Sequence, residues 1–166
     1  MIGALSKALS RPALRAAHAV RHRWRCWRKT PLSGVSMIAR DAEGRLLLVR
    51  LSYAEAGWSF PGGGPERGES MAAAAARELA EETGCAAEKV RLVGCVEETV
   101  SGSPHTAHVY TCLTDDLPRP DGREVVEARF FPAHSLPHPM TARTQARLAF
   151  WRAAERAPDD NQTRSP

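Results

Sequence analysis

The most constraining stretch of the sequence spans residues 63–85 and reads GGPERGESMAAAAARELAEETGC. Its alanine-rich second half strongly favours a helix. On that helix Glu78, Glu81 and Glu82 occupy positions i, i+3 and i+4, which share one face, with Cβ atoms about 5–6 Å apart. Like charges this close repel one another. The pattern therefore indicates either a cation held among the three carboxylates or a face open to water.

The flanks of this helix carry clear start and stop signals. Ser70 can cap its N-terminus, and Gly84 is suited to end it. Residues 62–64 are all glycine, which allows positive φ angles and a close approach of the backbone to a ligand. The side of the helix predicted to be buried consists of Ala72, Ala75, Ala76 and Leu79.

The rest of the chain alternates between strand-like and helix-like segments. Residues 34–40 and 45–51 predict a hairpin around the turn signal at residues 41–44. A turn at residues 101–104 separates two strand-like runs. This alternation predicts an α/β fold with a mixed sheet and helices on both sides. Further strands are expected at 58–60, 90–100, 107–113 and 125–131, and further helices at 12–29 and 141–154.

Charge is unevenly distributed along the 166 residues. Residues 1–30 contain eight Lys or Arg and no acidic residue, whereas residues 31–166 contain 15 basic and 19 acidic residues. We therefore expect a basic N-terminal helical arm (1–30), one folded domain (31–155) and a disordered tail (156–166). No apolar run approaches the length of a membrane span. The four cysteines form no C-x-x-C pair and are expected to be reduced core residues of a cytoplasmic protein.

Eight residues in and around the glutamate helix match a known motif. The pattern G-x5-E-x7-R-E-L-x-E-E-x-G resembles the Nudix box, and the one departure is Cys85, where the family usually has a bulky aliphatic residue. Cysteine packs as a small hydrophobe, so this departure is mild. The matching positions are Gly63, Glu69, Arg77, Glu78, Leu79, Glu81, Glu82 and Gly84.

The resemblance implies a Nudix fold, an α/β/α sandwich with a mixed sheet. It also implies a pyrophosphohydrolase that cleaves a P–O–P bond in a nucleoside diphosphate linked to another group. Substrate and site are both anionic, so a hard divalent cation must mediate between them. By resemblance this cofactor is Mg²⁺, with Mn²⁺ as the alternative.

The resemblance also implies roles for individual residues. Glu78, Glu81 and Glu82 would be metal ligands, one of which could instead be the general base. Arg77 would pair with Glu78 or with Glu69, and Glu69 would brace the loop rather than touch metal. The carbonyl of Gly62 could complete the metal shell, and a later loop would add Glu124, with Glu127 as second choice and Glu97 or Glu98 as further candidates. Substrate contacts are expected from Gly63, Gly64, Tyr53 and Trp58, although core packing is an equal alternative for Trp58.

Two functional alternatives and the oligomeric state remain open from the sequence. The fold could serve as a non-catalytic nucleotide-sensing module, although such proteins commonly lose the box glutamates. The basic arm could direct hydrolysis to RNA 5′ ends, but nucleic-acid binding is disfavoured because such arms more often dock an aromatic face. A homodimer is also open. His105 and His108 are expected on opposite faces of a strand, which argues against a shared metal site.

Overall fold

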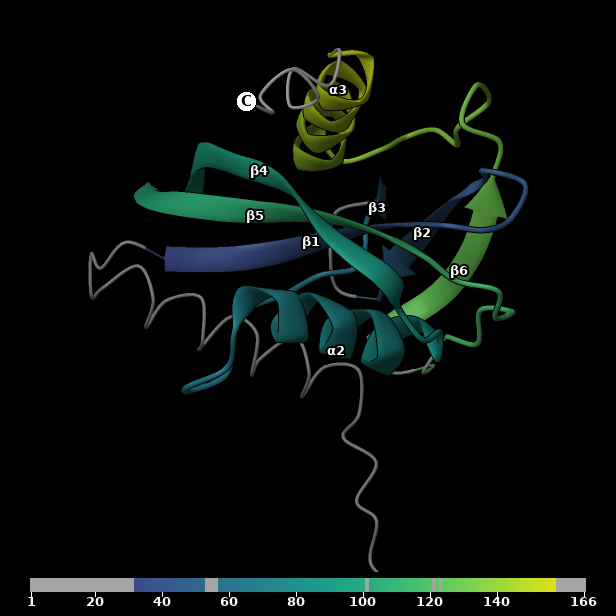
Figure 1. Cartoon of the computed structure of the whole chain (residues 1–166), viewed down its shortest axis with the longest axis horizontal. Coiled ribbons are helices and arrows are strands. Elements are labelled where there is room, and N and C mark those ends of the chain that lie inside the picture. Colours follow the sequence, from purple (N-terminus) through teal and green to yellow (C-terminus); the bar gives the residue numbers. More distant parts are fainter. Residues whose placement is uncertain (1–31, 53–56, 101, 121, 123, 158–166) are drawn as a thin grey trace, which may run out of the picture.

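The computed structural model describes residues 32–52, 57–100, 102–120, 122 and 124–157. The expected basic arm of residues 1–30, its helix at 12–29 and nearly all of the expected tail lie outside these residues. Figure 1 shows the arrangement of the elements. They are β1 (Leu32–Arg40), β2 (Leu46–Leu51), β3 (Trp58–Ser59), α2 (Met71–Thr83), β4 (Glu88–Val100), β5 (Ser103–Leu113), β6 (Val125–Phe131) and α3 (Ala142–Arg156).

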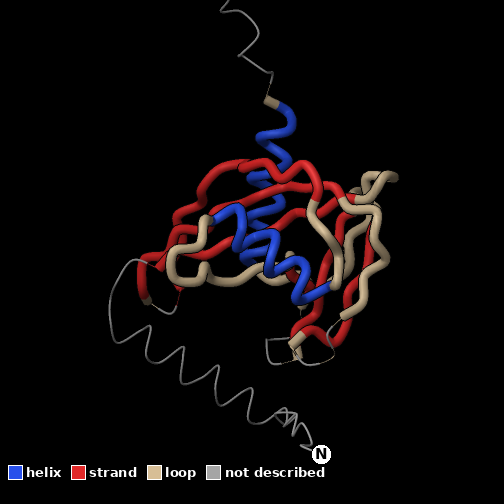
Figure 2. The backbone as a smooth tube through the Cα atoms, turned by 60° about the horizontal axis from the view of Figure 1, so that its bottom comes forward, coloured by secondary structure: helices blue, strands red, loops and turns tan. Residues whose placement is uncertain are grey.

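The strands form one mixed sheet, as the sequence predicts. Its order is β3-β2-β1-β5-β4, and β6 pairs with β2 outside this path. The parallel pair is β1 with β5, in register along all nine residues of β1, and the other pairings are antiparallel. The two helices α2 and α3 cover opposite faces of this sheet, which gives the expected α/β/α sandwich (Figures 1 and 2).

The alternation of side chains along the strands creates two separate cores. On β1, Val35, Met37 and Ala39 pack toward α2, while Ile38 packs toward α3. The same alternation on β2 gives Leu47 to the α2 side and Leu48 to the α3 side. Strands buried on both faces read as continuous apolar runs, which explains the LLLV segment of β2.

The hairpin between β1 and β2 opens immediately after its turn. Asp41 Oδ1 accepts hydrogen bonds from the backbone N–H groups of Glu43 and Arg45, which fixes the turn. Beyond the single pair Arg40–Leu46, β2 leaves β1 and pairs with β6. The freed edge of β1 is taken by residues 61–63 instead.

Two backbone hydrogen bonds attach this glycine segment to β1. The N–H groups of Met37 and Val35 donate to the carbonyls of Pro61 and Gly63, each at 2.8 Å. The glycine loop is therefore held against the central strand of the sheet, directly before α2 begins.

Helix α2 begins and ends where the sequence predicts. Ser70 Oγ accepts from the N–H of Ala73, and Gly84 closes the helix in the left-handed region at φ 71°. The predicted phase was partly wrong: Ala72 is exposed, and Ala74 and Ala75 are buried with Leu79. The helix is rotated because its last turn also buries Glu82 and Thr83.

Other expectations are corrected or confirmed by the remaining elements. Strand β5 begins at Ser103, so Pro104 belongs to the strand and not to the turn, because β4 and β5 pair up to their ends. Cys85 and Cys112 are buried as expected, but Cys95 is exposed on the edge strand β4. Strand β6 spans the predicted residues, and Leu148 and Trp151 face the core from α3. Neither described helix has the length and apolar character needed to span a membrane.

Candidate active site

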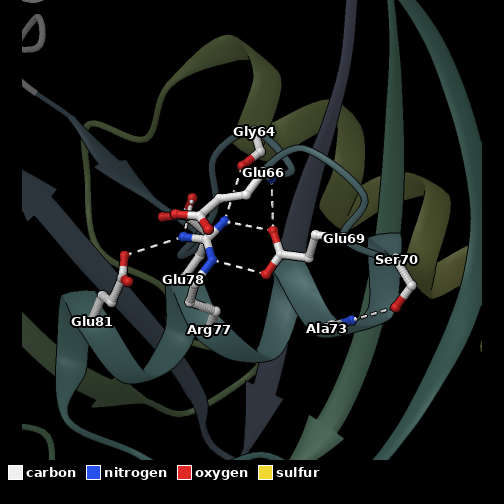
Figure 3. A network of polar contacts seen from close by, with 8 residues as sticks. All are labelled: Gly64, Glu66, Glu69, Ser70, Ala73, Arg77, Glu78 and Glu81. Carbon is white, nitrogen blue, oxygen red and sulfur yellow. Dashed lines mark hydrogen bonds and ion pairs between the residues drawn. The ribbon is translucent and has the colours of Figure 1, made fainter.

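Arg77 lies at the centre of the acidic face of α2 (Figure 3). Its Nε and Nη2 donate to the two carboxylate oxygens of Glu69 at 2.9 and 3.0 Å, a bidentate pair. Its Nη1 donates to Glu78 and to Glu81, each at 3.1 Å, and its Nη2 also donates to the carbonyl of Gly64 at 3.0 Å. Both predicted partners of Arg77 are thus used, with Glu69 making the stronger contact.

Glu69 ties the loop before α2 to the helix. Besides Arg77, its Oε2 accepts the backbone N–H of Glu66 at 2.8 Å. These two donors, Arg77 first, lower the pKa of Glu69 below its usual value of 4.5. The bracing geometry expected for Glu69 is therefore present.

The glycines of the loop make room for protein atoms. A Cβ at Gly63 would clash with the carboxylate of Glu78, and a Cβ at Gly62 would clash with the backbone carbonyl of Val35. At Gly64 a Cβ would meet nothing within 4 Å. Gly62 is thus required by the packing of the loop against β1, while Gly63 leaves room for the carboxylate of Glu78.

Glu82 is the most deeply buried of the three helix glutamates, at 8% exposure. Its Oε2 accepts the N–H of Gly62 at 3.3 Å, so the last turn of α2 is linked to the glycine loop. Glu81, in contrast, is exposed. The three carboxylates therefore differ in exposure, from Glu81 at the surface to Glu82, which is buried next to the glycine loop.

The environment of Glu78 disfavours its charge. Burial is the largest cause that raises its pKa, Arg77 opposes the shift, and the negative charges of Glu81 and Glu124 raise the pKa further. Glu124, which directly precedes β6, therefore brings its carboxylate within electrostatic reach of the helix. The structure thus brings the predicted set of Glu78, Glu81, Glu82 and Glu124 to one region.

The donors in this region fit a hard divalent cation. Glu82 is a buried carboxylate, and Glu81 and Glu124 each repel Glu78, which is the situation a bridging cation relieves. As they stand, no three His, Cys, Asp or Glu side chains among the described residues are grouped as metal ligands. Arg77 holds Glu78 and Glu81 toward itself, so metal binding requires these two side chains to rotate.

The other residues predicted for the site lie elsewhere in the fold or outside the described part of the chain. Trp58 is buried in the α3-side core, edge-on to the ring of Phe131 at 4.8 Å between centroids, which corresponds to the packing alternative. Tyr53 lies outside the described residues. Glu127 forms ion pairs with Arg50 and Arg129.

A second polar cluster, which the sequence did not predict, lies on the α3 side of the sheet and includes Glu98, one of the further candidates for the metal set. Glu98 on β4, His105 on β5 and Arg147 on α3 come together there. Arg147 is 49 positions from Glu98 in sequence, so only the pairing of Glu98 with His105 across β4 and β5 could have suggested a link.

Comparison with known proteins identifies relatives of this arrangement. The NUDIX domain family matches residues 30–151. A putative ADP-ribose pyrophosphatase, YjhB of Bacillus subtilis (strain 168), is 36% identical over 100 residues, which are 57% of this chain and 48% of the relative. The chain thus spans about half the length of the curated relative it matches.

Solved structures share the fold. A MutT NUDIX hydrolase from Burkholderia pseudomallei has a TM-score of 0.65 at 28% identity, covering 72% of this chain and 97% of that one. The NUDIX domain of Shewanella oneidensis NrtR, solved with ADP ribose, has a TM-score of 0.66 at 20% identity, with 75% and 88% covered. The second likeness shows the fold alone.

Proposed function

The chain belongs to the NUDIX family, and from this premise we propose that it is a divalent-metal-dependent pyrophosphohydrolase. Its substrate would be a nucleoside diphosphate linked to a further group, and the bond cleaved would be P–O–P. The observation that carries the proposal is the Arg77-centred carboxylate set on α2, which lies within electrostatic reach of Glu124 and is hydrogen-bonded to the glycine loop.

The proposed roles follow from where each group lies. Glu78, Glu81, Glu82 and Glu124, with the carbonyl of Gly62, would hold Mg²⁺, or Mn²⁺ in its place. When bound, the cation supplies neutralisation of phosphate charge and activation of water. Glu82 is linked to the loop through the N–H of Gly62, so its carboxylate has a defined position.

Arg77 acts as a positioning residue in this proposal. Its fork to Glu69 fixes the guanidinium, whose remaining N–H groups hold Glu78, Glu81 and the Gly64 carbonyl. One glutamate of the set accepts the proton of the attacking water at its carboxylate oxygen.

ADP-ribose is the first substrate to test. The Bacillus subtilis relative carries that activity in its name, and the NrtR domain was solved with ADP ribose. We therefore propose a nucleoside diphosphate sugar of the ADP-ribose type rather than a nucleoside triphosphate.

A hydrolysis screen tests the proposal. Purified protein with Mg²⁺ is incubated with ADP-ribose, nucleotide sugars, nucleoside triphosphates, dinucleoside polyphosphates and capped RNA. We expect turnover of at least one diphosphate derivative and a loss of at least about 100-fold in kcat for Glu82→Gln. Glu43→Gln, an exposed turn residue with an ion pair to Arg45, is the matched control and should retain activity. Binding without turnover by a folded protein would favour the nucleotide-sensing alternative.

A further inference from the structure

An open pocket lies on the α3 side of the sheet. It has a volume of about 230 Å³ and is formed between helix α3 and residues 133–140, which belong to the segment that connects β6 to that helix. Helices α2 and α3 cover opposite faces of the sheet, so the proposed catalytic set on α2 does not line this pocket (Figure 1). The pocket is therefore a separate place where a ligand could bind.

The inner wall of the pocket is apolar. Leu148 of α3 is 5% exposed and belongs to the α3-side core. Ala133, Leu136 and Met140 pack against that core from the connecting segment. An engineered apolar cavity of about 150 Å³ takes up benzene. The larger volume here has room for a hydrocarbon group of at least the size of a phenyl ring.

The rest of the lining is basic. Its polar side chains are Arg152, His134 and His138, and none of the described residues that line the pocket is acidic. Both histidines are exposed, and an imidazole offers at least one N–H donor in either protonation state. Acidic residues outnumber basic ones over residues 31–166, so this lining differs in charge from the domain around it. The pocket attracts an anion and repels a cation.

Arg152 keeps hydrogen-bond donors available at the pocket. Its Nη2 donates to the carbonyl oxygen of Ala133, which holds the guanidinium in place. The acid three positions further along α3, Glu155, instead pairs with Arg91 at 2.6 Å and with Arg40 at 3.9 Å. No acidic side chain in the described part of the chain forms an ion pair with Arg152. A guanidinium has five N–H donors, so most of those of Arg152 are left for a ligand.

The connecting segment is anchored at both of its ends. At one end, the N–H of Trp58 donates to the carbonyl of Pro139 at 2.9 Å, and the N–H of Thr141 donates to the carbonyl of Trp58 at 3.1 Å. At the other end, the N–H of Ser135 donates to the carbonyl of Pro132 at 2.8 Å. The wall of the pocket is therefore formed before a ligand arrives, which lowers the entropic cost of binding.

We propose that this pocket binds a small organic monocarboxylate. Its hydrocarbon group packs against Leu148 and Met140, and its carboxylate accepts the N–H groups of Arg152 that Ala133 leaves unused. A guanidinium can donate two parallel hydrogen bonds to a carboxylate. Inorganic phosphate lacks the hydrocarbon group, so it leaves the apolar wall in contact with water. This inference goes beyond the proposed function and does not depend on it, because the pocket and the catalytic set share no residue.

Titration of the full-length protein with 3-phenylpropionate tests the proposal without turnover. Carbon-13 methyl NMR follows Leu136, Met140 and Leu148, whose signals should shift to saturation. 3-Phenylpropionamide has the same shape without the charge, and acetate has the charge without the ring. Each should bind at least about ten-fold more weakly than the acid. No shift of these methyl signals with the acid, or equal affinity for the amide, for acetate or for inorganic phosphate, would overturn the inference.

Two variants and one competition experiment locate the site. Arg152→Gln should weaken binding of 3-phenylpropionate about ten-fold. The matched control is Arg156→Gln, since Arg156 is exposed in the last turn of α3 outside the pocket, and its affinity should equal that of wild type. Equal weakening in both variants would contradict the assignment. If Arg152→Gln does not fold, the comparison of acid and amide on the wild type decides.

Excess ADP-ribose should leave the affinity for 3-phenylpropionate unchanged. Displacement of the carboxylate by ADP-ribose would assign the pocket to the substrate and overturn the inference.

Discussion

At the scale of single residues, substitutions of Gly62 and Gly63 in the loop before α2 are expected to have different effects, one on stability and the other on activity. In Gly62→Ala the new Cβ meets the fixed carbonyl of Val35, so we expect a loss of about 1–3 kcal/mol in the free energy of unfolding. In Gly63→Ala the Cβ meets the end of the flexible Glu78 side chain, which can rotate away.

Gly63→Ala should therefore keep most of its stability and lose activity, on the order of ten-fold or more in kcat/KM, because Glu78 is displaced. Urea denaturation and steady-state kinetics on both variants measure the two effects. The explanation is contradicted if Gly62→Ala is as stable as wild type, or if Gly63→Ala is fully active.

The pair of Glu69 and Arg77 makes stability depend on pH. The pKa of Glu69 is lowered in the folded state, so its contribution is complete above the unfolded value of about 4.5 and is lost as the pH falls through the lower folded pKa. The difference in melting temperature between wild type and Glu69→Gln should be largest near pH 7 and shrink progressively below pH 4.5. A difference that persists undiminished at pH 2 would rule out this ion pair as its cause.

At the residue scale, the sequence predicted the acidic residues of the site, but it did not predict why the loop before α2 needs glycine. Spacing alone assigns Glu78, Glu81 and Glu82 to one helix face, whereas the bracing role of Glu69 was implied by the resemblance to the Nudix box. The need for glycine at position 62 depends on Val35, a partner 27 residues earlier that only the folded sheet supplies. The contact of Arg147 with Glu98 likewise joins residues 49 positions apart and leaves no local sequence pattern.

At the scale of elements, the cap of α2 positions the acidic face. Ser70 Oγ satisfies the N–H of Ala73, so Ser70→Ala should lower the free energy of unfolding by about 1 kcal/mol, whereas Ser70→Asp should keep the cap. Chemical denaturation of both variants gives the measurement. Equal losses in Ala and Asp would mean that the hydroxyl acts through something other than capping.

Element ends were predictable where the signal is local. Ser70, Gly84 and the residues of β6 are read directly from capping and alternation. The phase of α2 was missed because five alanines in a row carry no hydrophobic contrast, so the buried Glu82 and Thr83 decide its rotation instead. The start of β5 was placed too late because Pro104 suggested a turn, although a proline tolerates a strand end.

At the scale of the whole molecule, the described residues that form the two cores lie between Val35 and Trp151. A chain lacking residues 1–30 should therefore keep a cooperative unfolding transition by circular dichroism. Its hydrolysis of small nucleotides should change less than two-fold. A non-cooperative transition in the shortened chain would show that the first 30 residues belong to the folding unit.

The sandwich class followed from the alternation of strands and helices, but the strand order did not. The parallel pairing of β1 with β5 joins segments about 70 residues apart, and the early divergence of β1 from β2 leaves an edge that residues 61–63 fill. Such pairings depend on the whole sheet, so local patterns in the hairpin cannot reveal them.

Phosphorus-31 NMR of ADP-ribose during turnover tests the central claim most directly, since it identifies the bond that breaks. With Mg²⁺, the account predicts that the two diphosphate signals are replaced by two phosphomonoester signals of equal intensity, and that EDTA or Glu82→Gln prevents the change. Persistence of the diphosphate signals with folded wild-type protein and Mg²⁺, or equal turnover in EDTA, would contradict it.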